Sequence, residues 1–140
     1  MAKIGRSFIV HREPKGKQRV RVTRSGHAYT PNDTTTYEGM VRSEYIAQIG
    51  YAEPFKGPVE VMITARYEIP GSWSKKKQRE AAEQTIKPTK KPDCDNIAKM
   101  ICDALNGLAY KDDAQITRLT VIKGYTDELP NVEVILVGEV

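Results

Sequence analysis

The chain has 140 residues, of which 39% are hydrophobic and 29% are charged, and its net charge at pH 7 is +4. This length suits one domain with its own core, and the composition excludes a disordered or fibrous protein. No apolar run approaches the about 20 residues of a membrane-spanning helix, and the N-terminus lacks the apolar stretch of a secretory signal. We therefore expect a single domain over residues 1–140, in the cytoplasm and away from membranes.

Two cysteines are present, Cys94 and Cys102, eight positions apart and without a histidine nearby. This spacing matches neither a zinc-ligand pair nor a redox pair. We expect reduced thiols, as in most cytosolic proteins.

The charge is unevenly distributed along the chain. Residues 1–30 carry eight Lys or Arg side chains against one acid, and residues 71–91 carry seven against two. Residues 92–140 reverse this balance, with four basic side chains against nine acids. A basic segment that runs directly into an acidic one suggests that the first holds a polyanion and the second acts on it. The alternative is that the basic run at residues 75–79 only solvates a loop or a short helix.

Two strands are predicted at the start of the chain. They span residues 4–10 and 18–24, and the second shows alternation of apolar and polar residues. In the second stretch valines alternate with arginines, so we expect the valines in the core and the arginines on the outer face. Ser25 and Gly26 then predict a turn into a further extended stretch.

A helix and a strand are predicted in the middle of the chain. Pro31, Asn32 and Asp33 offer an N-cap, after which apolar residues recur at helical spacing until Gly50. These apolar residues are Tyr37, Val41, Tyr45 and Ile49. The following strand spans residues 59–69 and has one apolar face, made of Val59, Val61, Ile63, Ala65 and Tyr67. A short charged helix is predicted over residues 74–84.

The last third of the chain predicts one helix and two strands. Asp95 is a good N-cap for a helix over residues 96–106, which Gly107 ends, and its apolar stripe is expected to face the sheet. Residues 116–125 and 132–137 predict two strands whose short connection favours an antiparallel pair. The order of the elements predicts an α+β fold in which helices pack on one face of a mixed, largely antiparallel sheet.

Acidic side chains gather around this last helix. Asp93 and Asp95 lie two positions apart, so an extended approach to the helix would point both side chains the same way. Asp112 and Asp113 precede the strand at residues 116–125, and pairing of that strand beside the incoming chain would bring at least one of them to the first two. Carboxylates gathered in this way repel one another unless a cation lies among them, and Mg²⁺ prefers a few carboxylates together with substrate phosphate oxygens. We expect Mg²⁺, for which Mn²⁺ can substitute, at these four aspartates.

A lysine shares the exposed face of this helix. Lys99 lies one turn from Asp95, where it can stabilise charge on a phosphate or orient a nucleophile. It can equally be a salt-bridge partner of Asp95 and Asp103. Asp103 lies on the same solvated face, and the sequence gives little reason to assign it a role. The alternative for the acids themselves is ordinary structure, since single aspartates commonly cap helices and form turns.

One dense set of residues within residues 93–115 matches a known pattern. It consists of Asp93-Cys94-Asp95-Asn96, Lys99, Asp103-Ala104-Leu105 and Asp112-Asp113-Ala114-Gln115. This stretch resembles the RusA-type endodeoxyribonucleases, the Holliday junction resolvases carried by many prophages. Residues 14–31, with the sequence PKGKQRVRVTRSGHAYTP, resemble the basic N-terminal region of that family more loosely.

The resemblance implies a homodimer that binds a four-way DNA junction and makes paired, symmetric, Mg²⁺-dependent cuts. Carried over residue by residue, the catalytic acids would be Asp93, Asp95 and Asp113. Lys99 would be an accessory base or phosphate contact, and Asp112 a helper.

Basic side chains would then hold the DNA. The tract at residues 71–91 carries more of them than the family pattern leads one to expect, which is a departure from that pattern. The side chains that we expect at the DNA are Arg19, Arg21, Arg24, Lys75, Lys76, Lys77, Arg79, Lys90 and Lys91.

Two other functions stay open at this point. A non-catalytic module that binds junction or duplex DNA would use the acids only as caps and turns and would need no metal. A metal-dependent hydrolase of small phosphoesters would act on nucleotides and would not depend on the N-terminal arginines.

Overall fold

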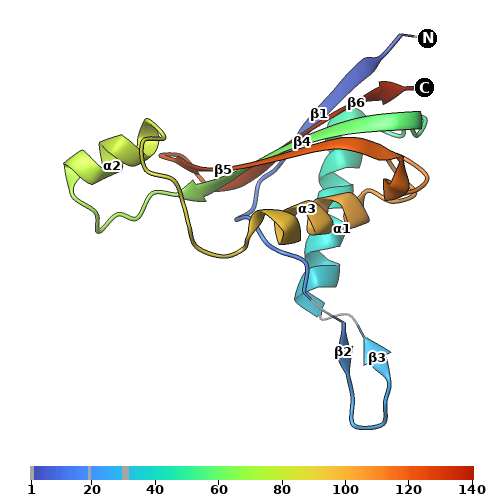
Figure 1. Cartoon of the computed structure of the whole chain (residues 1–140), viewed down its shortest axis with the longest axis horizontal. Coiled ribbons are helices and arrows are strands. Elements are labelled where there is room, and N and C mark those ends of the chain that lie inside the picture. Colours follow the sequence, from blue (N-terminus) through green and yellow to red (C-terminus); the bar gives the residue numbers. More distant parts are fainter. Residues whose placement is uncertain (1, 19, 30–31) are drawn as a thin grey trace.

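The structure, a computed structural model, describes residues 2–18, 20–29 and 32–140. A four-stranded sheet runs across the molecule, with helices α1 and α3 on one side of it and α2 beyond one end (Figure 1). The strands are β1 (Ile4–Val10), β4 (Lys56–Glu68), β5 (Ile116–Thr126) and β6 (Asn131–Glu139). The helices are α1 (Asn32–Ile49), α2 (Lys75–Ala82) and α3 (Cys94–Ala104), with a short 3-10 helix, η1 (Asp113–Gln115). Strands β2 (Arg21–Val22) and β3 (Ala28–Tyr29) form a separate hairpin.

The sheet has the order β1-β6-β4-β5, in which only β4 and β5 pair in parallel. This confirms the predicted α+β class and the mixed, largely antiparallel sheet with helices on one face. The predicted pairing of the last two strands with each other is wrong, because β4 lies between them. Two inter-strand spacings amount to about 10 Å, and an extended residue spans about 3.3 Å. Residues 127–130 can therefore cross β4, so a short connection does not require neighbouring strands.

The centre of the core is the helix-facing side of β4. The predicted apolar face of this strand is buried and packs with apolar residues of α1 and α3 into one cluster, which confirms the prediction. The β4 residues of this face are Val59, Val61, Ile63, Ala65 and Tyr67. In α1 the buried residues include Tyr37, Val41 and Tyr45, and the helix is followed by Gly50 with a φ of +92°, as the sequence predicts.

The predicted boundaries of helix α3 need a correction. The helix spans Cys94–Ala104 and so lies two residues earlier than residues 96–106. Asp93 occupies the N-cap position, its carbonyl accepts the first helical hydrogen bond, and Asp95 lies within the first turn. Aspartate is favoured both at an N-cap and in the first turn of a helix, so two aspartates two positions apart leave the start of the helix ambiguous in the sequence.

The strand predicted over residues 18–24 is shorter than expected and lies outside the core. Strand β2 has two residues, and Val22 is 65% exposed. The β2–β3 hairpin projects away from the sheet beyond the N-terminal end of α1 (Figure 1). Alternation indicates that two faces of a strand differ, but it does not indicate that the apolar face has a core to pack against. Arg19 and Pro31 lie outside the described residues.

The charged segment around α2 forms a lobe that is fixed to the edge of the sheet. Helix α2 confirms the predicted charged helix, and Ser74 caps it by accepting a hydrogen bond from the Lys77 backbone at 3.2 Å. The Gln84 side chain accepts from the Tyr125 backbone N–H at 3.0 Å and donates to the Tyr125 carbonyl at 2.8 Å. Trp73 packs edge-to-face on the Tyr125 ring, with 5.4 Å between centroids. The lobe is therefore held by specific contacts with β5.

Two further observations concern compartment and thiol chemistry. No helix among the described residues is both long and apolar enough to cross a membrane. Cys94, which is exposed, and Cys102, which is buried, are both free thiols.

We predict that replacing Leu136 by alanine lowers the free energy of unfolding by about 2–5 kcal/mol, because Leu136 is fully buried in the centre of the sheet. Urea denaturation measures this loss. Leu129→Ala removes the same atoms from a side chain that is 81% exposed, and it should change the free energy of unfolding by no more than about 0.5 kcal/mol. Equal losses in the two variants would contradict the arrangement of the core.

Candidate active site

One face of α3 carries the acidic and basic side chains of the site. Asp95, Lys99 and Asp103 recur at every fourth position and therefore lie along one side of the helix. Of the two predicted salt-bridge partners of Lys99, the structure shows Asp103, whose Oδ2 lies 3.5 Å from the Lys99 Nζ. The opposite side of the helix is apolar and buried against the core, which keeps the polar side at the surface.

The turn before β5 holds the next two aspartates. Asp112 is the N-cap of η1, where it forms a reciprocal capping arrangement with Gln115. The Gln115 side chain also donates to the carbonyls of Phe55 and Gly57, both at 3.0 Å, so it fixes the turn to the start of β4. The backbone N–H of Asp113 donates to the Asn106 side chain at 2.8 Å. These bonds fix the backbone from which the Asp113 side chain extends.

A hollow of about 440 Å³ lies between α3, η1 and the start of β5. Its walls carry three carboxylates and two basic side chains, together with apolar groups of β5. The charged residues that line it are Asp95, Lys99, Asp103, Asp113 and Arg118. We call it the acidic hollow. The structure thus brings together three of the predicted site residues, Asp95, Lys99 and Asp113.

Two carboxyl groups lie close together in the acidic hollow. The Asp113 side chain lies within hydrogen-bonding reach of the Asp103 carboxyl group. Burial raises the pKa of Asp113, the hydrogen bond and negative charge of Asp103 raise it further, and the charge of Asp112 adds to this effect. Lys99 acts in the opposite direction and lowers this pKa. The pair therefore holds negative charge that a cation would stabilise.

Asp93 and Asp112 do not line the acidic hollow. Asp93 is exposed at the N-terminus of α3, where its Oδ1 accepts a hydrogen bond from the Asn96 side chain at 2.6 Å. The predicted extended approach that would align Asp93 with Asp95 is therefore wrong, because Asp95 is already helical. The predicted pairing of β5 with the chain entering α3 is also wrong, because the partner of β5 in the sheet is β4.

The chemistry of the acidic hollow fits a hard divalent cation. Carboxylate oxygens are the ligands that Mg²⁺ and Mn²⁺ prefer, and Asp103 and Asp113 already lie side by side with Asp95 lining the same hollow. Within residues 2–18, 20–29 and 32–140, however, no group of three or more His, Cys, Asp or Glu side chains converges closely enough to hold an ion. The carboxylates are of the right type to bind such a cation, but they are not gathered around one point.

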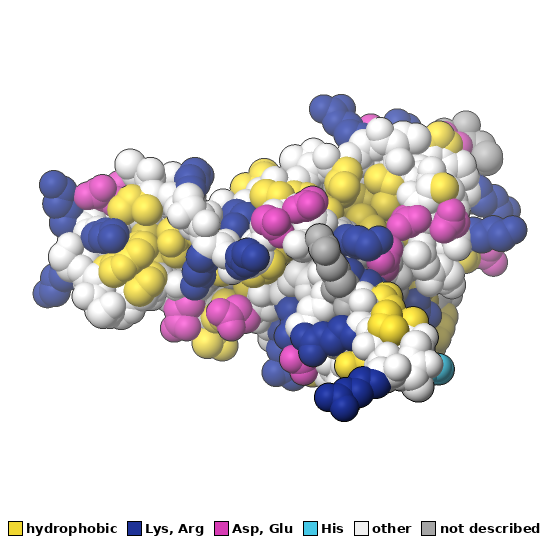
Figure 2. Space-filling view, turned by 60° about the horizontal axis from the view of Figure 1, so that its bottom comes forward, with side chains coloured by type: hydrophobic (Ala, Val, Ile, Leu, Met, Phe, Trp, Pro, Cys, Tyr) yellow, Lys and Arg dark blue, Asp and Glu magenta, His cyan; other side chains and the backbone are white. Residues whose placement is uncertain are grey.

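Basic side chains are exposed on several elements of the molecule. Figure 2 shows Lys and Arg side chains spread over one face, with acidic side chains interspersed among them. Lys75, Lys76, Lys77 and Arg79 are exposed on α2, Arg21 and Arg24 are exposed on the β2–β3 hairpin, and Lys90 and Lys91 are exposed just before α3. Two of these lysines also contact aromatic rings, Lys77 with Nζ 4.1 Å from the centroid of Trp73 and Lys90 with Nζ 5.3 Å from that of Tyr67.

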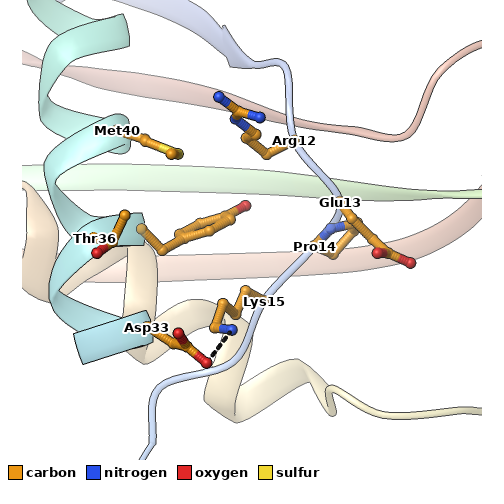
Figure 3. Close-up of a pocket in the computed structure, with 8 residues that line it drawn as sticks. Arg12, Glu13, Pro14, Lys15, Asp33, Thr36 and Met40 are labelled. Atoms are coloured by element: carbon orange, nitrogen blue, oxygen red, sulfur yellow. Dashed lines mark ion pairs between the residues drawn. The ribbon is translucent and has the colours of Figure 1, made fainter. Parts of the chain in front are cut away.

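A second hollow of about 370 Å³ separates the segment after β1 from the first turns of α1 (Figure 3). Lys15 points across it to Asp33, with 3.6 Å between Nζ and Oδ2, and Arg12 and Glu13 lie further along the segment. Its charged side chains are two basic and two acidic, so it offers a cation fewer carboxylates than the acidic hollow does. We therefore take the acidic hollow as the candidate site.

Known proteins are similar to this chain over most of its length. Residues 12–137 match the family described as Endodeoxyribonuclease RusA. The chain belongs to this family. It is also similar to the uncharacterized protein YqaN of Bacillus subtilis (strain 168), with 35% identity over 137 residues that cover 92% of this chain and 93% of YqaN. The resemblance inferred from the sequence is confirmed, and family membership supports a nuclease that acts on DNA.

Sequence reasoning missed three charged residues of this RusA-family site. Asp103 was interpreted as inert, although its spacing of four from Lys99 and eight from Asp95 is a signal that places all three on one helix face. Arg118 and Lys17, which lies 3.5 Å from Asp103, carry no local signal. Both are distant in the sequence and reach the site only through the tertiary fold.

We predict that Gln115→Ala lowers the free energy of unfolding by about 1–3 kcal/mol, because it removes several hydrogen bonds that tie the η1 turn to β4. Urea denaturation measures the change. Gln115→Glu keeps the accepting oxygen but turns a charged oxygen towards the two carbonyls in place of the donating NH₂ group, so its loss should be at least as large. A loss below about 0.5 kcal/mol for Gln115→Ala would show that the turn is held by other contacts.

Proposed function

We propose that this protein is a Mg²⁺-dependent endonuclease that cleaves four-way DNA junctions by paired, symmetric hydrolysis of phosphodiester bonds. The observation that carries the proposal is the contact between the carboxyls of Asp103 and Asp113, in a hollow that Asp95 and Lys99 also line. Family membership supports the class of reaction, since nucleases of the RusA family generally depend on a divalent metal.

The aspartates of this region are the proposed ligands and catalytic acids. We assign Asp93, Asp95 and Asp113 to the ion, with Asp112 as a helper, and add Asp103 because of its contact with Asp113. When bound, a Mg²⁺ or Mn²⁺ ion would neutralise charge that develops on the phosphate and lower the pKa of an attacking water.

The basic side chains of the chain have two proposed roles. Lys99 is exposed beside the carboxylates, where its ammonium group can contact a phosphate oxygen and stabilise added negative charge. The exposed lysines and arginines of α2, the hairpin and the segment before α3 bind the DNA backbone. Backbone binding of this kind positions the duplex without reading its sequence.

A homodimer completes the proposal. Resolution of a four-way junction needs two strands to be cut, and the acidic hollow is built from the residues of one chain. A two-fold dimer would present two such hollows to a junction, with each chain cutting one strand.

A non-catalytic DNA-binding module is the second candidate. The observation in its favour is that no three metal-binding side chains converge among the residues described. This candidate expects junction and linear duplex to be bound with the same dependence on salt and expects no cleavage with any divalent metal.

We predict that Asp95→Asn and Asp113→Asn each lower the rate of Mg²⁺-dependent cleavage of a labelled four-way junction by at least about 100-fold, because each removes a charged ligand. Junction binding without metal should persist, since the basic side chains are unchanged. Asp127→Asn alters an exposed aspartate in the connection between β5 and β6 and should cleave at the wild-type rate. Wild-type rates in both site variants would favour the non-catalytic module.

We predict that the triple replacement Lys75→Gln, Lys76→Gln and Arg79→Gln weakens junction binding and reduces its salt dependence. Each lost phosphate contact should reduce the slope of log affinity against log salt by about 0.9, so the maximum reduction is about 3. Fluorescence anisotropy at several salt concentrations measures both quantities. Lys77 is left in place because it packs on Trp73. An unchanged slope would exclude α2 from the DNA-binding surface.

A further inference from the structure

Lys17 is a basic side chain of the N-terminal segment that is turned inward. Its Nζ lies 2.9 Å from Oε2 of Glu38 on α1 and 3.5 Å from Oδ2 of Asp103 on α3. The three side chains are only 18–20% exposed, so water screens this interaction less than it screens an ordinary surface ion pair. Asp103 is in turn the carboxylate that contacts Asp113. An unbroken series of contacts thus connects α1 with the acidic hollow.

The backbone around Lys17 is fixed as firmly as its side chain. The Lys17 N–H donates to the Asn96 carbonyl of α3 at 3.0 Å. A Cβ on Gly16 would lie 2.9 Å from that of Pro92, so only glycine allows the segment to approach α3 this closely. On the other side, the fully buried Thr34 of α1 donates to the Gln18 side chain at 3.1 Å. Residues 16–18 are therefore clamped between α1 and α3.

Asp103 lies between two lysines and the carboxyl group of Asp113. Lys99 approaches it along the exposed face of α3, but the Lys99 side chain is 62% exposed and has little else to hold it. Lys17 approaches from the buried side and is itself held by Glu38. Burial acts to lower the pKa of Lys17, but the Glu38 hydrogen bond and charge, followed by Asp103, outweigh it, so this pKa is raised and the ammonium stays charged at neutral pH.

We propose that Lys17 is a positioning residue, which holds the Asp103 carboxylate beside Asp113 so that the two can receive a divalent cation. The inference rests on the proposed function, and it assigns Lys17 to the metal centre rather than to the DNA backbone. Partners of this kind, which orient a ligand without touching the metal, commonly contribute 10–100-fold to metal affinity by the general rule for outer-shell groups.

The direction in which metal affinity changes separates a positioning role of Lys17 from a purely electrostatic one. A lysine near a cation site repels the cation, so loss of the Lys17 charge by itself should tighten metal binding. Loss of a positioning residue should weaken it, because the Asp103 carboxylate then turns away from Asp113. A role in DNA binding would instead lower junction affinity in the absence of metal.

The experiment compares Lys17→Met, Lys17→Arg and a control, Lys15→Met, in the full chain. Lys15 lies two residues earlier and pairs at 3.6 Å with the exposed Asp33, away from the acidic hollow. Binding of Mn²⁺ to each protein without DNA is followed by the loss of the electron paramagnetic resonance signal of free Mn²⁺. Metal-free junction affinity and the Mg²⁺ concentration for half-maximal cleavage are measured on the same samples, and circular dichroism checks folding.

We expect Lys17→Met to weaken Mn²⁺ binding and to raise the Mg²⁺ requirement by about 10-fold, with metal-free junction affinity unchanged. Lys17→Arg should recover wild-type binding to within about threefold, and Lys15→Met should match the wild type. If Lys17→Met fails to fold, Lys17→Gln keeps hydrogen-bonding capacity at this position without the charge, and it should show the same weakening.

Two outcomes would overturn the inference on its own. One is unchanged or tighter Mn²⁺ binding in the folded Lys17→Met or Lys17→Gln protein, alongside a wild type that binds Mn²⁺ and cleaves junctions. The other is a loss of metal-free junction affinity with an unchanged metal requirement. A wild-type protein that neither binds Mn²⁺ nor cleaves would overturn the proposed function and the inference together.

Discussion

The site depends on the contact between two carboxyl groups, those of Asp103 and Asp113. Two neighbouring negative charges destabilise the fold unless a proton, a lysine or a metal compensates them, and burial of Asp113 strengthens the repulsion. The fold accepts this cost because α3 is anchored by its apolar side and η1 by Gln115. Neither aspartate can then move far from the other, which stores negative charge at one place on a protein with a positive net charge.

The same arrangement explains why the basic side chains are divided into two groups. Helix α2 and the hairpin lie away from the centre of the sheet (Figure 1), and their lysines and arginines are exposed. Lys17 and Lys99 instead remain with Asp103, where their charges limit the repulsion between carboxylates. Position in the fold, and not charge alone, separates the side chains that we propose for DNA binding from those that we propose to support the site.

The sequence predicted what local periodicity controls. The strand face from Val59 to Tyr67 and the helix that Gly50 follows are confirmed, because burial on one face and positive φ leave a direct mark on residue type. The order of β5 and β6 and the exposure of Val22 could not be predicted, because both depend on which surfaces meet in three dimensions. For the same reason nothing in the sequence connects Lys17 with Asp103, which lies 86 positions later. Membership in the RusA family, in contrast, could be inferred from local motifs.

A crystal structure of the protein grown with Mn²⁺, with anomalous scattering used to locate the ion, tests the central claim most directly. The account predicts an anomalous peak in the acidic hollow, with carboxylate oxygens of Asp95 and Asp113 within about 2.2 Å of it. A protein saturated with Mn²⁺ that shows no peak there, or a peak only at a distant surface, would contradict it.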